Sequence, residues 1–93
     1  MPEAPSVNPH DWILIRTSPV PRTALVYLTT VQEGKQIAGV IYRDDQRQTV
    51  ADDVCWVQDH WEFLRSGPTG TIAEAVPAAQ PFIADFELGM NRK

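Results

Sequence analysis

The segment Thr49–Arg65, TVADDVCWVQDHWEFLR, decides how the rest of this 93-residue chain is interpreted. As a helix it would carry one continuous apolar stripe, because apolar residues recur every third or fourth position. These are Val50, Val54, Val57, Trp61 and Leu64. As two strands it would form a hairpin with Asp59-His60 at the tip. Cys, Trp, Val and Phe are weak helix formers and suit cross-strand packing, which favours the strands.

The flanking sequence also favours the hairpin. Asp44-Asp45-Gln46 before the segment is typical of a turn, and Ser66–Gly70 (SGPTG) after it is a strong turn signal. Thr71–Val76 (TIAEAV) then fits a strand that pairs back onto Trp61–Arg65. We therefore predict a hairpin over residues 49–65, with the helix as the alternative.

The N-terminal half contains three further strand patterns. Trp12–Ile15 is a short, β-branched apolar run that predicts a buried strand. Thr23–Gln32 and Gln36–Arg43 flank the turn residues Glu33-Gly34-Lys35 and predict an antiparallel hairpin. Near the C-terminus, Phe82–Leu88 alternates apolar and polar residues, which predicts a last strand.

Together these elements predict a mainly β fold, namely a small antiparallel meander or a partly open barrel of five to six strands. If residues 50–65 formed one helix, the fold would instead be α+β, with that helix packed on an antiparallel sheet. Prolines at positions 2, 5 and 9 indicate a flexible N-terminal arm over residues 1–10. We expect one compact domain over 11–89 and a C-terminal tail over 90–93, because a chain of this length has room for one core.

Composition excludes several classes of protein. Hydrophobic residues at 43% and charged residues at 22% are ordinary globular values, and no apolar run approaches the ~20 residues that span a bilayer. The N-terminus lacks the features of a secretory signal, and a single cysteine fits a reducing compartment, so we expect a cytoplasmic protein. A net charge of −4 argues against binding to nucleic acid.

No catalytic or metal-binding pattern stands out, so the sequence favours a non-enzyme while leaving enzymatic activity open, and it predicts no cofactor. Cys55 and His60 are the one candidate nucleophile and base, but nothing resembles a nucleophile elbow or an oxyanion loop. A lone cysteine beside tryptophan and valine is usually a small core residue. One cysteine and two histidines cannot supply the four ligands of a structural zinc site, and there is no EF-hand loop.

An acidic band is the first candidate for a contact surface. Between Asp44 and Glu62 lie six of the twelve carboxylates of the chain, one basic residue (Arg47) and two of the three tryptophans. Such a band usually forms solvated loop tips, but beside exposed tryptophan it is also typical of a protein interface. The predicted interaction residues are Trp56, Trp61, Asp52, Asp53, Asp59, His60 and Glu62.

Three functions remain open. The leading one is a non-catalytic interaction module that forms a homodimer and has a basic protein as a possible partner. The second is a small-molecule binding domain or minor enzyme, with Asp and His at the mouth of an aromatic pocket. That pocket would be lined by Trp56, Trp61, Phe63, Tyr27 and Tyr42. The third is an acidic inhibitor of a nucleic-acid-binding protein, which requires the carboxylates to form one exposed stripe.

Overall fold

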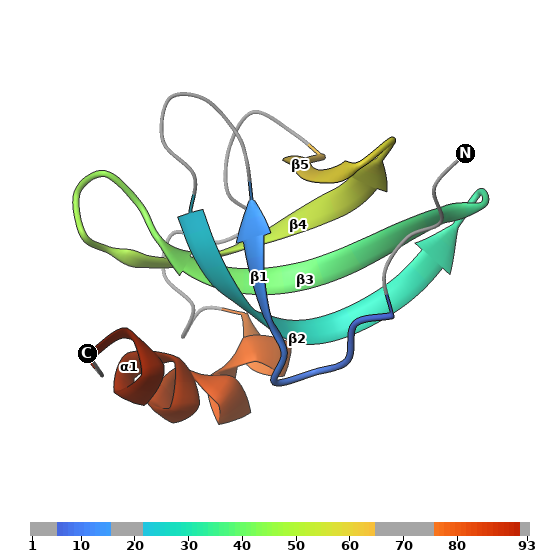
Figure 1. Ribbon diagram of the computed structural model, residues 1–93. Coiled ribbons are helices and arrows are strands. Elements are labelled where there is room, and N and C mark those ends of the chain that lie inside the picture. Colours follow the sequence, from blue (N-terminus) through green and yellow to red (C-terminus); the bar gives the residue numbers. More distant parts are fainter. Residues whose placement is uncertain (1–5, 16–21, 65–75, 92–93) are drawn as a thin grey trace.

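Five strands follow one another around a closed sheet in the computed structural model, which describes residues 6–15, 22–64 and 76–91 (Figure 1). The strands are β1 (Trp12–Ile15), β2 (Arg22–Gln32), β3 (Lys35–Arg43), β4 (Thr49–Val57) and β5 (His60–Phe63). A 3-10 helix, η2 (Pro77–Phe82), runs into the C-terminal helix α1 (Ile83–Asn91). The predicted mainly β fold is confirmed.

Closure of the barrel depends on the pairing of the first strand with the last. Consecutive strands pair antiparallel, whereas β1 and β5 run parallel and, within the described residues, pair through Ile15 and Trp61. An up-and-down meander with an odd number of strands leaves its first and last strands pointing the same way, so the closing pair is parallel. Among the described residues, this closing pair is the shortest of the five strand pairings.

Two tight turns set the register of the two hairpins. Glu33-Gly34 connects β2 to β3, with φ of 51° and 79°, and positive φ at both positions suits the right-handed twist of the strands. Gln58-Asp59 connects β4 to β5, with Gln58 at φ 58°. The predicted hairpin over residues 49–65 is confirmed for its described part, 49–64, and the helix alternative is wrong, although the tip lies one residue earlier than expected.

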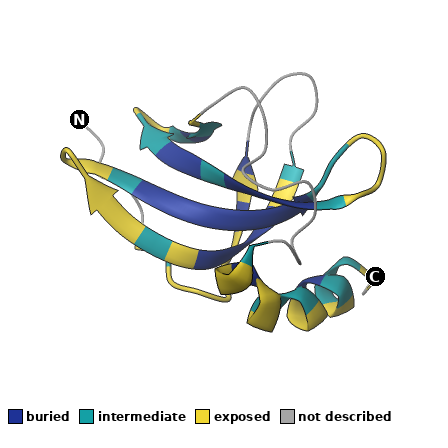
Figure 2. Cartoon of the chain, turned by 180° about the vertical axis from the view of Figure 1, so that it is seen from behind, coloured by how far each residue is buried: buried dark blue, intermediate teal, exposed yellow. Residues whose placement is uncertain are grey.

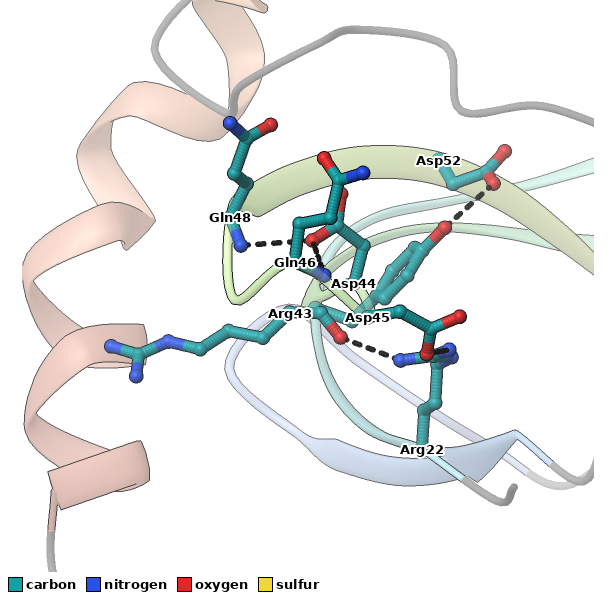
Figure 3. Close-up of polar contacts among 8 residues, drawn as sticks. Arg22, Arg43, Asp44, Asp45, Gln46, Gln48 and Asp52 are labelled. Atoms are coloured by element: carbon teal, nitrogen blue, oxygen red, sulfur yellow. Dashed lines mark hydrogen bonds and ion pairs between the residues drawn. The ribbon is translucent and has the colours of Figure 1, made fainter. Parts of the chain in front are cut away.

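The predicted turn after β3 is also present, and Asp44 builds it. Its Oδ1 accepts hydrogen bonds from the backbone N–H groups of Gln46 and Gln48, each at 2.9 Å (Figure 3). Arg22 of β2 reaches the same turn and forms an ion pair with Asp45. These two carboxylates of the acidic band therefore stabilise this turn.

The inward face of the sheet forms the first core. Alternate residues of a strand share a face, and the buried stretches of β3 and β4 run through the middle of the molecule (Figure 2). The buried residues are Ile13, Ile15, Ala24, Val26, Ala38, Val40, Tyr42, Val50, Val54 and Trp61. Asp52 lies between Val50 and Val54 on this face and is 2% exposed. The hydroxyl of Tyr42 donates a hydrogen bond to Asp52 Oδ2 at 3.4 Å (Figure 3).

The C-terminal helix covers the outer face of the sheet. A second core joins Leu25, Tyr27, Ile41, Ala51, Ala79 and Phe86. Phe86 is fully buried there, and a polar contact holds α1 beside it. Glu87 forms an ion pair with Arg43 of β3 and accepts a hydrogen bond from Thr49 Oγ1 at 3.1 Å. The barrel thus has cores on both sides of its wall.

The strand predicted over Phe82–Leu88 is wrong, because most of this segment belongs to α1. Its apolar residues fit two periods: Ile83, Phe86 and Met90 also recur at helical spacing and pack on the second core. The apolar outer face of β2 and β3 needs a cover, and a helix provides one without extending the sheet. Of the strand predicted over residues 71–76, positions 71–75 lie outside the described residues.

Candidate functional site

A pocket of about 380 Å³ opens where β1 and β5 diverge. Among the described residues, the ladder between the two strands consists of Ile15 and Trp61, and the pocket walls come from the residues just before this pair on each strand. The segment that enters β1, β4 and the β4–β5 turn complete the wall. The lining residues are Val7, Trp12, Ile13, Leu14, Trp56, Asp59, His60 and Trp61. The volume lies within the range of ligand pockets, at its lower end.

All three tryptophans of the chain converge on this pocket. Trp56 and Trp61 are cross-strand partners of β4 and β5, and their rings meet edge to face with centroids 5.3 Å apart. Trp12 approaches from β1 and is 40% exposed, while Trp61 is almost fully buried. On its other side Trp12 stacks on Phe86 of α1, with centroids 5.8 Å apart. The pocket therefore has one wall supported by the helix and another that belongs to the barrel core.

The indole N–H of Trp56 makes the aromatic wall unusual. Its Nε1 is buried and has no hydrogen-bond partner within the described part of the chain. A buried donor without an acceptor costs free energy, so Trp56 is not at an optimum for stability alone.

His60 sits at the rim between two carboxylates. Its Nδ1 lies 3.0 Å from Asp59 Oδ1, and its Nε2 lies 2.5 Å from Glu62 Oε2. Hydrogen bonding first to Asp59 and then to Glu62 raises the pKa of His60 above its ordinary value of 6.5. With both carboxylates ionised, the three side chains carry a negative sum whether or not the imidazole is protonated. No Lys or Arg among the described residues lines the pocket.

The structure divides the seven predicted interaction residues into two groups. Trp56, Trp61, Asp59 and His60 line the pocket, and Glu62 is bound to His60. Asp52 and Asp53 lie apart from it, farther along β4. Asp52 faces the barrel interior. The turn that contains Asp44 and Asp45 precedes β4, whereas Asp59 follows it, so these carboxylates lie at opposite ends of the strand. The carboxylates thus form no single exposed stripe, which the inhibitor hypothesis required.

The two tyrosines are buried in the two cores and do not line the pocket. Tyr42 faces the barrel interior beside Asp52, and Tyr27 packs beneath η2. Burial, followed by the charge of Asp52, raises the pKa of Tyr42 to about 12. Burial, followed by the charges of Asp53 and Asp52, raises the pKa of Tyr27 to about 12. Phe63 packs against Tyr42, with ring centroids 5.3 Å apart. Of the five aromatic residues expected to line a pocket, Trp56 and Trp61 do so, whereas Phe63, Tyr27 and Tyr42 do not.

Besides Val7 and Ile13, the sequence did not predict the pocket residues Trp12 and Leu14. Both were placed in a buried strand, yet they point to the outside of β1, whereas Ile13 and Ile15 point inward. Trp12–Ile15 is apolar at every position and so reveals no inward face, and nothing local shows that β1 closes the ring against β5.

Catalytic and metal chemistry gain no support from this geometry. Cys55 is buried on β4 and is not part of the pocket wall. Among the described residues, no group of three or more His, Cys, Asp or Glu side chains is arranged to hold a metal ion. No helix in the described part is long and apolar enough to cross a membrane. What the barrel does present is an aromatic pocket with an acidic rim.

Comparison of the chain with protein-family models, with curated proteins and with solved structures gives no match.

Proposed function

We propose that this protein is a non-catalytic binding module that takes up a chemical group of its partner in the pocket between β1 and β5. The observation that carries the proposal is the convergence of Trp12, Trp56 and Trp61 on one open pocket. Tryptophan gives the largest apolar contact area of any side chain and is enriched where proteins bind their partners. Trp61 also belongs to the barrel core, whereas Trp56 is partly buried and Trp12 is exposed.

A second property supports binding over a purely structural role for the pocket. Among the described residues, the wall combines rigid rings with two titratable side chains, Asp59 and His60. Ligand sites are commonly built in this way, with mostly apolar walls and a few polar groups that orient the ligand. The same geometry favours the aromatic-pocket hypothesis as far as binding is concerned, without its catalytic part.

The proposal is tested by nuclear magnetic resonance with a fragment library. The three indole N–H signals are assigned from the single variants Trp12→Phe, Trp56→Phe and Trp61→Phe, and fragments are screened for shifts of these signals. We expect binders to perturb the indoles together with His60. A screen in which every binder shifts residues outside the pocket would overturn the proposal, as would the absence of any binder.

A matched pair of variants separates the pocket from the rest of the surface. Leu14→Trp narrows the pocket from β1, and Leu28→Trp makes the same change on β2 outside it; the two leucines are 46% and 49% exposed. We expect only Leu14→Trp to abolish the shifts caused by the fragments. Equal effects of the two variants would contradict the assignment of the site.

A further inference from the structure

Resting on the proposed function, we infer that the group taken up by the pocket is a planar aromatic ring, namely the side chain of a phenylalanine, tyrosine or tryptophan in an exposed segment of a protein partner. Three features of the site select this class. They are the support that α1 gives to one indole, the angle between the other two indoles, and the exposed apolar surface of β1 beside the pocket.

An aromatic stack reaches the pocket from α1. Trp12 lies nearly parallel to Phe86, at an interplanar angle of 21° and with ring centroids 5.8 Å apart. Gly89 of the same helix approaches the six-membered ring of this indole. Since α1 covers this side of Trp12, the exposed part of the indole is the part that lines the pocket. A ring that enters there can stack on Trp12, and Phe86 holds the indole in place for it.

Trp56 and Trp61 offer a second set of ring contacts. Their planes meet at 71°, with centroids 5.3 Å apart, so a ring that lies parallel to one of them is nearly perpendicular to the other. Aromatic rings attract one another both when stacked with an offset and when they meet edge to face, because the face of a ring is negative and its edge positive. A saturated group in the same space gains only from the burial of its area. The walls therefore favour a flat aromatic ring over a saturated group of similar size.

His60 adds a fixed flat ring at the rim. Its Nδ1 is bound to Asp59 and its Nε2 to Glu62, so both nitrogens are engaged within the chain. An imidazole nitrogen has one hydrogen or one lone pair in the plane of the ring, and each is used here. The imidazole thus offers a ligand the surface of its ring more than a hydrogen-bonding nitrogen, which again suits an apolar ring.

The size and surroundings of the pocket indicate that a protein segment carries the ring. A volume of about 380 Å³ is small for a ligand that must be enclosed on most of its surface, whereas a side chain needs only its ring enclosed. Trp12 and Leu14 lie on the same outer face of β1 and are both exposed, so apolar surface continues from the pocket along the strand. Apolar neighbours of the ring in the same segment would contact this surface. Tryptophan and tyrosine are enriched among the residues that dominate protein interfaces, and such residues tend to face one another across the interface.

The test compares an aromatic ring with a saturated one. A short peptide with one phenylalanine between leucines and serines is titrated against the same peptide with cyclohexylalanine. The saturated ring is more apolar, so burial of area alone would make the cyclohexylalanine peptide bind at least as tightly. Ring stacking predicts the reverse, and we expect the phenylalanine peptide to bind about fivefold more tightly. In nuclear magnetic resonance spectra, its ring current should also shift the Trp12 indole signals more than the saturated ring does.

Three variants separate ring contacts from buried area. Trp12→Leu keeps an apolar group but removes the ring, and should abolish the preference for phenylalanine. Leu14→Ala removes area beside the pocket, and should weaken both peptides by a similar factor while the preference remains. Leu28→Ala makes the same change on β2 outside the pocket, and should leave both affinities within about twofold. Circular dichroism checks that each variant folds, and the ring-current shift in the wild type tests the stack should Trp12→Leu not fold.

The possible outcomes separate this inference from the proposal beneath it. If fragments bind in the pocket but neither peptide does, or if cyclohexylalanine binds as tightly as phenylalanine, the proposed function stands and the aromatic class is wrong. If N-acetylphenylalanine amide binds as tightly as the phenylalanine peptide, a free aromatic compound is the occupant and the assignment to a protein segment is overturned. If no probe reaches the indoles and the fragment library also fails, the proposed function itself falls.

Discussion

Trp12 lies so close to Gly89 that a Cβ placed on Gly89 would stand 2.3 Å from Cζ2 of the indole. This contact joins α1 to the wall of the pocket, because the same indole faces the pocket and stacks on Phe86. The C-terminal helix therefore both covers the outer face of the barrel and holds one of the three tryptophans in position.

Gly89→Ala should consequently damage the pocket although alanine is the better helix former. The helical gain is about 1 kcal/mol, whereas forcing a rigid ring out of a packed contact costs about 1–3 kcal/mol. We expect a net loss of about 1 kcal/mol in the free energy of unfolding by urea denaturation, together with a shift of the Trp12 indole signal. The pair Leu88→Ala and Leu88→Gly measures the helical term alone, since Leu88 is 61% exposed. A stabilised Gly89→Ala with an unchanged Trp12 signal would contradict the contact.

Gly34 is the opposite case: a larger side chain would have room there, but the backbone conformation disfavours most residues other than glycine. Its φ is 79°, and an added Cβ would meet nothing within 4 Å. Gly34→Ala should therefore lose about 1–2 kcal/mol of stability through left-handed backbone strain alone. Gly34→Asn should recover part of this loss, because asparagine tolerates that conformation better. Equal unfolding midpoints for the wild type and Gly34→Ala would show that the turn has a different conformation.

Removing the hydroxyl of Tyr42 should destabilise the barrel by about 1 kcal/mol, because Asp52 in the interior loses a hydrogen-bond donor. Tyr27→Phe is the matched control, since the Tyr27 hydroxyl makes no hydrogen bond within the described residues. Its effect on the unfolding midpoint should be smaller. If Tyr27→Phe and Tyr42→Phe lower stability equally, the contact between Tyr42 and Asp52 contributes nothing specific.

Stability should also decline at alkaline pH. Both tyrosines have their pKa raised to about 12, so the unfolded chain releases their protons from pH 10 upward while the folded chain keeps them. The stability that the neutral phenols contribute is fully present below pH 10 and is lost as the pH rises through about 12. Spectrophotometric titration of tyrosinate should show both groups ionising together with unfolding. Ionisation of either buried group near pH 10 in the folded protein would contradict the burial.

His60 should link stability to pH near neutrality. Its pKa is raised by Asp59 and Glu62, so the folded state favours the protonated imidazole. That contribution is fully present below the ordinary pKa of 6.5 and is lost as the pH rises through the pKa of the folded state. The difference in unfolding free energy between wild type and His60→Gln should thus be larger at pH 6 than at pH 8.5. A background carrying His10→Gln removes the other histidine from the titration, and a difference that does not change with pH would refute the link.

Self-association remains a prediction, and the free part of β2 is where we place it. Beyond Val26 this strand pairs with β3 alone among the described elements, and Leu28 and Val31 are exposed there. An unpaired strand edge readily pairs with a second copy. Size-exclusion chromatography with light scattering at tens of micromolar should give twice the monomer mass, and Val31→Lys should shift it to the monomer while Leu88→Lys does not. A strictly monomeric wild type would remove the dimer.

Much of the sheet was predictable because its signals are local. The ranges of β1, β2 and β3 follow from short β-branched runs and from the turn chemistry of Glu33-Gly34. The hairpin of β4 and β5 was harder, because Val50, Val54 and Trp61 fit a helical period as well. Turn signals on both sides and the strand preference of the aromatic residues decided it correctly.

The strand predicted for the C-terminal segment was wrong because its pattern of apolar residues fits both a strand and a helix. Residues 82–88 alternate like a strand, but Ile83 and Phe86 also fit a helix, and local preference does not separate the two. The deciding factor was the uncovered apolar surface of Leu25, Tyr27 and Ile41, which exists only once β2 and β3 have paired. Similarly, the acidic band could not show that Asp52 turns inward while Asp59 stays outside.

By itself, the sequence determined the strand-forming runs, the tight turns and the side chains available for binding or reaction: three tryptophans, many carboxylates and one cysteine beside apolar neighbours. Only the tertiary structure decided that Trp12 meets Trp56 and Trp61 in one pocket, and that α1 supports it. The reason is physical. Strand and turn preferences act between neighbours in the chain, whereas the pairing of Ile15 with Trp61 and the docking of α1 depend on surfaces that form only after the sheet has closed.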